Sequence, residues 1–313
     1  MSDNSKESGG DLVKYPIRTV TELTGVHSVT LRAWERRYGL IKPERTPKGH
    51  RLYSQADIES IQRITELLNQ GISIGQVRPL LERGLSLPVE EEQNEQQDVW
   101  QGYRDELLGA IERFNENEVE HLYNDALSLY PLGLVHSHLI IPTLHLLGER
   151  WKDREAGISE EHFFTTYLRN KLGSRIQHLN QHNNGPLLMI ACLPGEYHEV
   201  GMMMFTLAIL DKGYRALVLG ANVPLQQIPL VQQQRPCAGI VLSASARISG
   251  NVLQDALPAL VEQLNIPVFI GGNASERHRE AILEAGAQFA SSDIAYALTQ
   301  IAERVPLRLH SSS

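Results

Sequence analysis

The chain has 313 residues, enough for two or three domains, and its hydrophobic content of 42% is ordinary for globular proteins. The net charge of -8 hides an asymmetry: residues 11–84 hold twelve Lys or Arg against eight Asp or Glu, whereas residues 85–313 hold sixteen against twenty-seven. Only the N-terminal part is therefore expected to contact a polyanion. The sequence contains no run of eighteen apolar residues, so no membrane span is expected. The two distant cysteines, Cys192 and Cys237, favour a reducing cytoplasm over a disulfide framework or thiolate metal site.

The basic N-terminal part predicts a DNA-binding domain. After a disordered tail of residues 1–12, residues 13–84 predict short helices, and the open face of the second presents hydroxyl and guanidinium groups that suit a major groove. The segment ERTPKGHRLY after Pro43 predicts a hairpin wing that brackets phosphates, with Tyr53 packed behind it. The first two helices take their apolar faces from Leu23, Val26, Leu31 and Trp34. The predicted DNA contacts are Thr30, Arg32, Arg36, Arg37, Arg45, Lys48, His50 and Arg51.

This segment resembles the MerR family of transcription regulators. The resemblance is carried by TLRAWERRYGL, by the P-x-R of Pro43–Arg45 and by GHRLYS. It implies a winged helix-turn-helix over residues 13–84, a dimer formed through a helix after the wing, and a palindromic promoter element in double-stranded DNA. Metal-sensing members of the family carry cysteines near the dimer helix. Residues 54–98 contain none, so metal sensing is not expected.

The middle of the chain predicts helices. The acidic, Pro-containing stretch 85–98 predicts a linker or the solvated start of a helix, and residues 99–183 predict a bundle of four antiparallel helices with short connections. The expected helices lie near residues 99–114, 117–130, 132–152 and 159–182.

Residues 184–313 change to short apolar runs separated by helical patterns, which predicts a parallel sheet covered on both faces. The expected strands are 187–193, 215–220, 239–245, 267–272 and 287–291. The whole chain is thus multidomain α/β: a winged helix-turn-helix, a four-helix bundle and a doubly wound, Rossmann-like or flavodoxin-like sheet. Such a sheet binds ligands at the carboxyl ends of its strands.

The segment Glu196-Tyr-His198-Glu-Val-Gly201 directly follows the first of these strands. A histidine there is well placed to ligate a group held above the sheet, and Glu196 is placed to accept the other imidazole proton and fix the tautomer. Gly201 permits close approach to the following helix. The segment resembles the D-x-H-x-x-G motif of cobalamin-binding domains, with Glu in place of Asp.

That resemblance implies that His198 is the axial ligand of cobalt in a B12 cofactor and replaces its lower base. In the family, the freed nucleotide tail enters the sheet past a Ser-x-Leu segment and a Gly-Gly turn. Ser243-Ala-Ser245 stands at the first place, with Ser245 where the family has Leu, and Gly271-Gly272 stands at the second. Small residues there would leave a channel beside the strands.

A second motif, Trp151 with Glu161-His162 after nine intervening residues, lies at one end of the predicted bundle. It resembles the W-x9-E-H signature of the light-sensing CarH or LitR regulators, whose bundle covers the upper face of adenosylcobalamin. The domain order matches that family as well. In photoreceptor members a second cobalt-ligating His follows the Trp. Here Lys152 takes that place, and a protonated lysine has no lone pair to donate; His162 or His145 are the substitutes to consider.

The family resemblance implies a DNA-binding repressor rather than an enzyme, controlled by adenosylcobalamin and light. The cofactor would stabilise a homo-oligomer, a dimer or tetramer, on DNA in the dark. Two alternatives remain open. One is a regulator whose C-terminal domain senses another ligand or partner and not light. Lys152 and Ser245 favour this interpretation. The other is a corrinoid methyl carrier, against which the promoter-binding wing argues.

Overall fold

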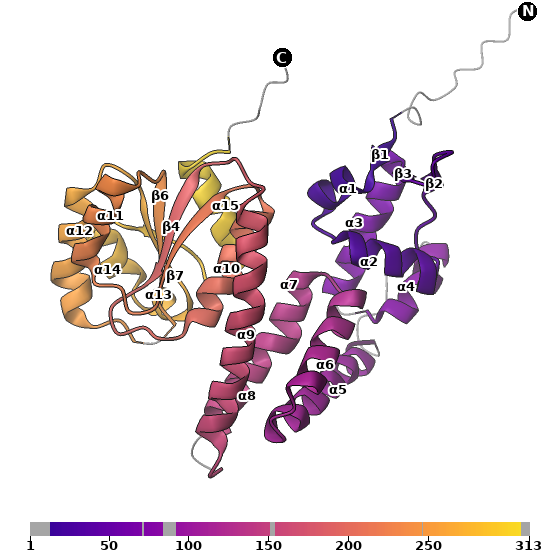
Figure 1. Cartoon of the computed structure of the whole chain (residues 1–313), viewed down its shortest axis with the longest axis horizontal. Coiled ribbons are helices and arrows are strands. Elements are labelled where there is room, and N and C mark those ends of the chain that lie inside the picture. The colour runs from indigo at the N-terminus through magenta and orange to yellow at the C-terminus, as the bar shows by residue number, and fades with distance from the viewer. Residues whose placement is uncertain (1–12, 71, 84–91, 151–153, 246, 308–313) are drawn as a thin grey trace, which may run out of the picture. The chain divides into compact units, whose positions relative to one another are not determined.

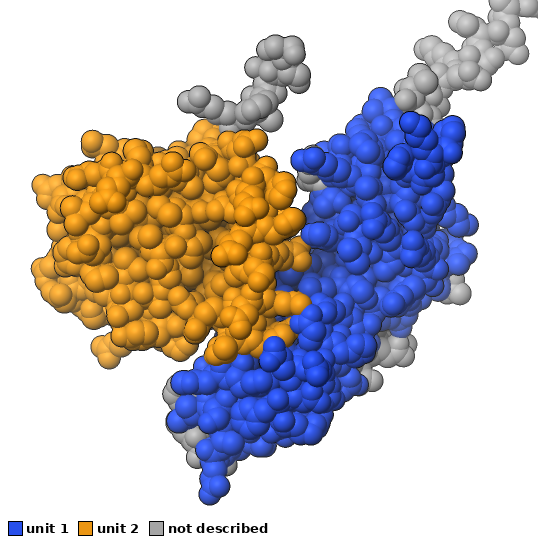
Figure 2. Space-filling model, viewed as in Figure 1, with its two compact units in different colours: residues 1–164 blue, residues 165–313 orange. Residues whose placement is uncertain are grey.

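A computed structural model describes residues 13–307 except 71, 84–91, 151–153 and 246 (Figure 1). The chain divides into two compact units, residues 1–164 and residues 165–313, coloured separately in Figure 2. No helix in the described part of the chain is long and apolar enough to cross a membrane.

The first unit begins with a small domain, here called the head, that comprises the described residues 13–83. Its strands are β1 (Tyr15–Pro16), β2 (Glu44–Arg45) and β3 (Arg51–Tyr53). Its helices are α1 (Ile17–Thr24), α2 (Ser28–Ala33), the π-helical turn η1 (Trp34–Tyr38), α3 (Gln55–Asn69) and α4 (Ile74–Arg83). The strands form an antiparallel sheet in the order β1-β3-β2, so the predicted wing hairpin, β2–β3, is confirmed.

Local sequence explains the junctions of the head. Gly25 ends α1 in the left-handed region at φ 70°, a conformation that favours glycine, and its N–H bonds to Thr21. Val26, Leu31 and Trp34 are fully buried as predicted, but Leu23 is 53% exposed and that expectation was wrong. Val20, also fully buried, is the residue that α1 turns toward the interior.

The rest of the first unit is helical. Its helices are α5 (Glu92–Glu112), α6 (Glu116–Leu129), α7 (Leu132–Val135), the π-helical turn η2 (His136–Ile140), α8 (Ile141–Glu149) and the start of α9 (Gly157–Asn180). All four predicted helices are present, the third as the run α7-η2-α8. The first helix starts earlier than predicted, inside the expected linker. Asn115 caps α6 by accepting a bond from Glu118 N, and Pro131 immediately precedes α7.

The second unit contains the end of α9 and a five-stranded parallel sheet. The strands are β4 (Leu187–Cys192), β5 (Arg215–Gly220), β6 (Gly239–Ser243), β7 (Val268–Gly271) and β8 (Gln288–Phe289). The order β5-β4-β6-β7-β8 is that of a flavodoxin-like, doubly wound sheet, as predicted. Its topological switch point, where such folds bind ligands, lies between β4 and β6.

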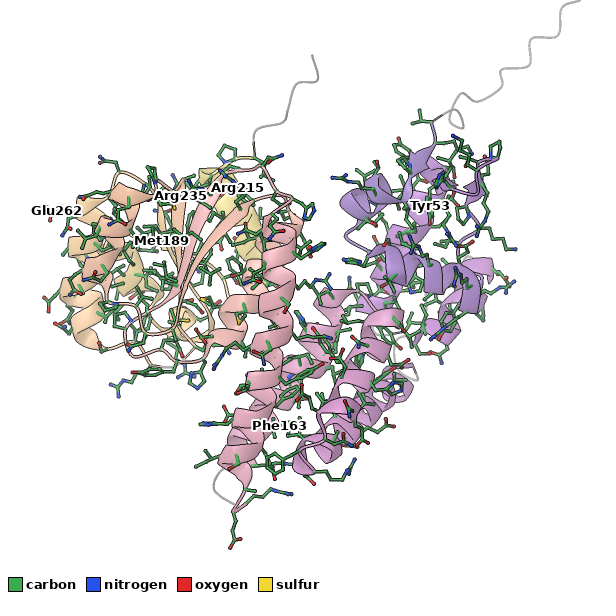
Figure 3. All side chains as sticks on the ribbon, viewed as in Figure 1. Tyr53, Phe163, Met189, Arg215, Arg235 and Glu262 are labelled. Atoms are coloured by element: carbon green, nitrogen blue, oxygen red, sulfur yellow. The ribbon has the colours of Figure 1, made fainter. Side chains whose placement is uncertain are left out.

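Helices cover both faces of this sheet (Figure 1). They are α10 (Glu199–Asp211), the 3-10 turn η4 (Leu225–Gln227), α11 (Ile228–Gln234), the π-helical turn η5 (Val252–Ala256), α12 (Leu257–Gln263), α13 (Asn273–Arg277), α14 (Arg279–Glu284) and α15 (Ile294–Arg304). Strand β4 is buried throughout, and its residue Met189 lies inside the layers (Figure 3). At the β5 edge, the side chain of Asn180 bonds to both N and O of Ala216 and so takes the place of a further strand.

Candidate functional site

The loop between β4 and α10 presents His198 at the carboxyl end of β4. His198 precedes the first residue of α10, and its side chain is 58% exposed. Its Nδ1 lies 2.6 Å from Oε1 of Glu196, which is 3% exposed. When the imidazole is neutral, Nδ1 donates its proton to this carboxylate, and the lone pair of Nε2 remains for another partner.

Glu196 also connects the two strands at the switch point. Oε1 accepts a second hydrogen bond from the His198 N–H at 2.8 Å, and Oε2 accepts one from the Ser245 N–H at 2.5 Å. The carboxylate therefore fixes the loop after β4 against the segment after β6. The bond between Glu196 and Ser245 was not predicted from the sequence, because the two residues are 49 positions apart.

The small residues predicted for a nucleotide tail gather at the same edge of the sheet. Ser243 pairs with Cys192 on one side and with Gly271 on the other. Gly272 has φ 95°, and a Cβ on it would lie 2.5 Å from the Ala244 carbonyl oxygen. Glycine at 272 is thus required by the backbone itself, whether or not a ligand passes.

Gly201 and Cys192 also lie at this edge of the sheet. A Cβ on Gly201 would lie 3.8 Å from Ser245 Oγ, which is an ordinary contact distance. Burial, with Glu196 and Glu199 nearby, raises the pKa of the Cys192 thiol to about 12. The thiol therefore stays protonated at neutral pH in this environment.

The second predicted motif is described only in part. Trp151 and Lys152 lie outside the described residues, whereas Glu161 and His162 lie in the second turn of α9. The preceding Glu160 is 1% exposed.

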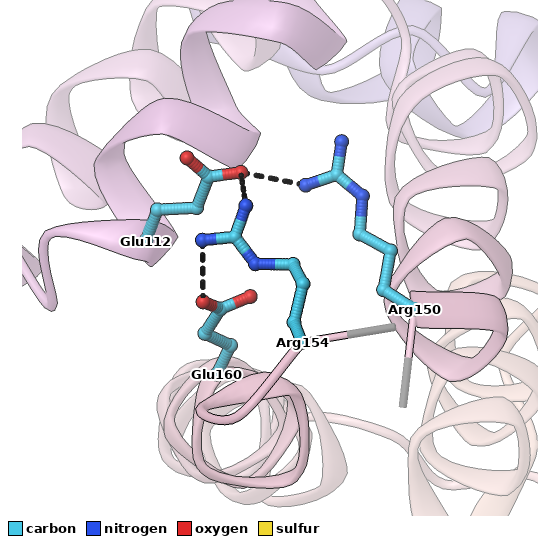
Figure 4. Close-up of polar contacts among 4 residues, drawn as sticks. All are labelled: Glu112, Arg150, Arg154 and Glu160. Atoms are coloured by element: carbon cyan, nitrogen blue, oxygen red, sulfur yellow. Dashed lines mark hydrogen bonds and ion pairs between the residues drawn. The ribbon is translucent and has the colours of Figure 1, made fainter. Parts of the chain in front are cut away.

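Ion pairs surround this end of the helices (Figure 4). Arg154 bonds to Glu160 at 3.1 Å and to Glu112 of α5 at 3.1 Å, and Arg150 bonds to Glu112 at 2.7 Å. This network connects α5 with residues on both sides of positions 151–153. No motif marks these charges, so the network was not predicted from the sequence.

The head exposes most of the side chains predicted to contact DNA. Those exposed are Arg32, Arg36, Arg37, Arg45, Lys48 and His50. Arg51 is only 13% exposed and pairs with Glu35 at 2.5 Å, and Arg45 pairs with the same carboxylate at 2.7 Å. Burial raises the pKa of Glu35, but the hydrogen bonds and charges of Arg51 and Arg45 outweigh it, so the pKa lies below its ordinary value. Tyr53 packs in the interior of the head, as predicted (Figure 3).

Thr30 differs from the expectation. It was placed on the open face of α2 but is 1% exposed, and its hydroxyl donates to the Leu127 carbonyl of α6 at 3.1 Å. Trp34 Nε1 donates to the Leu129 carbonyl at 2.8 Å. Thr30 of α2 and Trp34 of η1 are therefore both bonded to the α6 backbone, through contacts that no local pattern in the sequence encodes.

Comparison with known proteins agrees with this architecture. The family described as MerR HTH family regulatory protein matches residues 15–84, and the B12 binding domain family matches residues 103–175. The HTH-type transcriptional repressor CarH of Myxococcus xanthus is 30% identical over 85% of this chain and 91% of its own length. The repressor CarA of the same organism is 28% identical over 88% and 92%. The chain is a CarH-type regulator of the MerR family.

Solved structures add a similarity of fold. The monomethylamine corrinoid protein of Methanosarcina barkeri matches with a TM-score of 0.51 at 19% identity, over 65% of this chain and 98% of that protein. The CarH-type chain places a parallel sheet after a helical region. The match supports the Rossmann-like fold.

The site geometry of the CarH-type chain fits the B12 group that its family implies. A corrin ring supplies its own equatorial nitrogens, so a side chain that binds its metal would have to supply only one axial donor. Among the described residues, no three His, Cys, Asp or Glu side chains gather to hold a bare metal ion. His198 offers an exposed imidazole whose Nδ1 lies against the buried Glu196 carboxylate, a pairing that is common for histidines that ligate metals.

Proposed function

We propose that this CarH-type chain represses transcription from a palindromic promoter element in the cytoplasm, and that adenosylcobalamin ligated by His198 controls its binding to DNA. The observation that carries the proposal is the exposed His198 imidazole bonded to the buried Glu196 at the switch point of the sheet. Bound adenosylcobalamin supplies a cobalt–carbon bond that light breaks. The small residues Gly201, Ser243, Ser245, Gly271 and Gly272 are proposed to accommodate the nucleotide tail.

The upper face of the cofactor is assigned to Trp151, Glu161 and His162. This part of the proposal rests on the W-x9-E-H spacing and on the similarity to CarH over 85% of the chain. Lys152 has no lone pair when protonated, so it is not proposed as a ligand after light has acted.

Control of DNA binding is proposed to act through oligomerisation. Two or more heads on one assembly raise the effective affinity for a palindrome without any new contact. The cofactor stabilises the assembly only to the extent that it binds the assembled form better than the separated one. The exposed cations of the head supply phosphate contacts, with Arg45 and Lys48 on the wing.

Thr30 adds a condition to DNA binding. Its hydroxyl cannot reach a base edge while it bonds to the Leu127 carbonyl. We therefore include in the proposal that α2 separates from the α6 backbone when Thr30 contacts DNA.

The test uses the full chain with adenosylcobalamin, in darkness and after illumination. We compare absorption spectra, size-exclusion profiles and DNA binding in the two conditions. The DNA fragments are first selected from a random pool by their binding to the chain. The proposal expects a His-ligated spectrum and a larger, DNA-binding assembly in the dark, both reversed by light. His198→Ala should lose the His-ligated spectrum, while the exposed control His121→Ala on α6 should keep it.

Two outcomes contradict the proposal in different ways. A chain that stays colourless and unassembled with adenosylcobalamin refutes the cofactor. DNA binding that ignores cobalamin and light favours a regulator that senses another ligand or partner.

A further inference from the structure

The segment 220–223 at the end of β5 contacts residues 195–199, the loop that carries His198. The first contacts are with the N-terminal part of this loop. Asn222 Oδ1 accepts a hydrogen bond from the Gly195 N–H at 2.8 Å. In the opposite direction, the Asn222 N–H donates to the Glu196 carbonyl at 2.9 Å. These reciprocal bonds fix the backbone immediately before and at the residue whose carboxylate orients His198.

The same segment contacts the loop on its C-terminal side. Glu199, the first residue of α10, accepts a bond from the Ala221 N–H at 2.9 Å through Oε1. Its Oε2 pairs with Arg169 Nε of α9 at 3.1 Å. A Cβ on Gly220, which has φ 91°, would lie 3.0 Å from Glu199 Oε1, so the glycine lets the carboxylate approach. Residues 195–199 are thus bonded to one segment at both ends.

The backbone conformation explains why Asn stands at 222. Its φ is 49°, in the left-handed region that Asn tolerates better than most side chains other than glycine. Glycine would adopt the same backbone but would offer no acceptor to Gly195. Aspartate would offer the acceptor and tolerate the conformation.

We propose that Asn222 is a positioning residue for His198. It binds Gly195 and Glu196, and through them it holds the Glu196 carboxylate where it accepts the Nδ1 proton of His198 and leaves Nε2 free for a ligand. The cobalt-ligating part of this statement rests on the proposed function, whereas the orientation of the imidazole does not.

The first experiment needs no cofactor. Nitrogen-15 NMR of the full chain, at a pH where imidazole is neutral, reports which ring nitrogen of His198 carries the proton. The wild type is expected as the Nδ1–H tautomer, whereas histidine without such a partner favours Nε2–H. Asn222→Gly should raise the Nε2–H population. Asn222→Asp, and the control Asn265→Gly in an exposed turn with the same Asn-to-Gly change, should match the wild type.

The second experiment uses hydroxocobalamin as the probe. Loss of an outer partner of a metal-ligating histidine weakens binding by about 10–100-fold, so Asn222→Gly is expected to lose roughly tenfold or more. Asn265→Gly should keep wild-type affinity. A wild type that binds no hydroxocobalamin refutes the proposed function, while the tautomer measurement still decides the assignment of Asn222.

Hydrogen exchange of the wild type guards against a variant that fails to fold. The Gly195 N–H bonds to the side chain of Asn222, so its exchange should be slow although the residue is exposed. Exchange as fast as in an unstructured chain overturns the proposal. So does an Asn222→Gly variant that keeps the wild-type tautomer and affinity.

Discussion

Replacing Glu196 with Gln tests whether a carboxylate is required at the switch point of the sheet. The carboxylate accepts bonds from His198 Nδ1 at 2.6 Å, His198 N at 2.8 Å and Ser245 N at 2.5 Å, and the residue is 3% exposed. A Gln amide has one accepting oxygen and one donating NH2 group, so either His198 or Ser245 faces a donor. A buried donor left without an acceptor costs about 1–3 kcal/mol.

Two further effects act on the same substitution. Hydrogen bonds to a charged acceptor are stronger than those to an amide, so replacing the carboxylate lowers the stability further. Removing a buried charge regains desolvation energy, which offsets part of it. We expect Glu196→Gln to lower the free energy of unfolding of the α/β domain by about 1–3 kcal/mol.

Urea unfolding followed by circular dichroism at neutral pH measures this change. Glu284→Gln, an exposed position on α14, is the matched control and should stay within about 0.5 kcal/mol of the wild type. An unfolding midpoint of Glu196→Gln equal to that of the control would show that the carboxylate does not organise the switch point.

Three other predictions concern the head and the Gly-Gly turn. The pKa of Glu35 is lowered, so its ion pairs stabilise the folded head at pH values above the ordinary carboxyl pKa. This stabilisation is lost as the pH falls through the pKa of Glu35 in the folded state. Glu35→Gln should therefore cost about 1–2 kcal/mol at pH 7 and less at about pH 3 in urea unfolding, and an equal cost at both would contradict the ion pairs. Tyr53→Phe should leave the thermal midpoint unchanged or raise it, because the buried hydroxyl has no hydrogen-bond partner among the described residues; a clear drop would reveal one. Gly272→Ala should destabilise the α/β domain by about 2 kcal/mol or more in the same assay, because φ 95° and a Cβ 2.5 Å from the Ala244 oxygen both oppose a side chain; a neutral result would show that the turn relaxes freely.

Much of the architecture could be predicted from local patterns. The five apolar runs give five strands within two residues of their expected bounds, because short apolar runs between helical patterns are typical of a parallel sheet covered by helices. The Gly25 turn and the wing hairpin follow from local turn chemistry. The predictions that fell short are those that depend on what packs against an element, namely the exposed Leu23 and the buried Thr30.

The candidate site divides in the same way. The sequence by itself determined that His198 has Glu196 within reach, since a spacing of two residues at the end of a strand brings both into one loop. Only the tertiary structure decided that Ser245 and Asn222 bind this loop, because the sheet topology alone places their strands beside β4. Contacts within a few residues are set by local conformation, whereas contacts between distant segments depend on strand order and helix packing, which no local pattern contains.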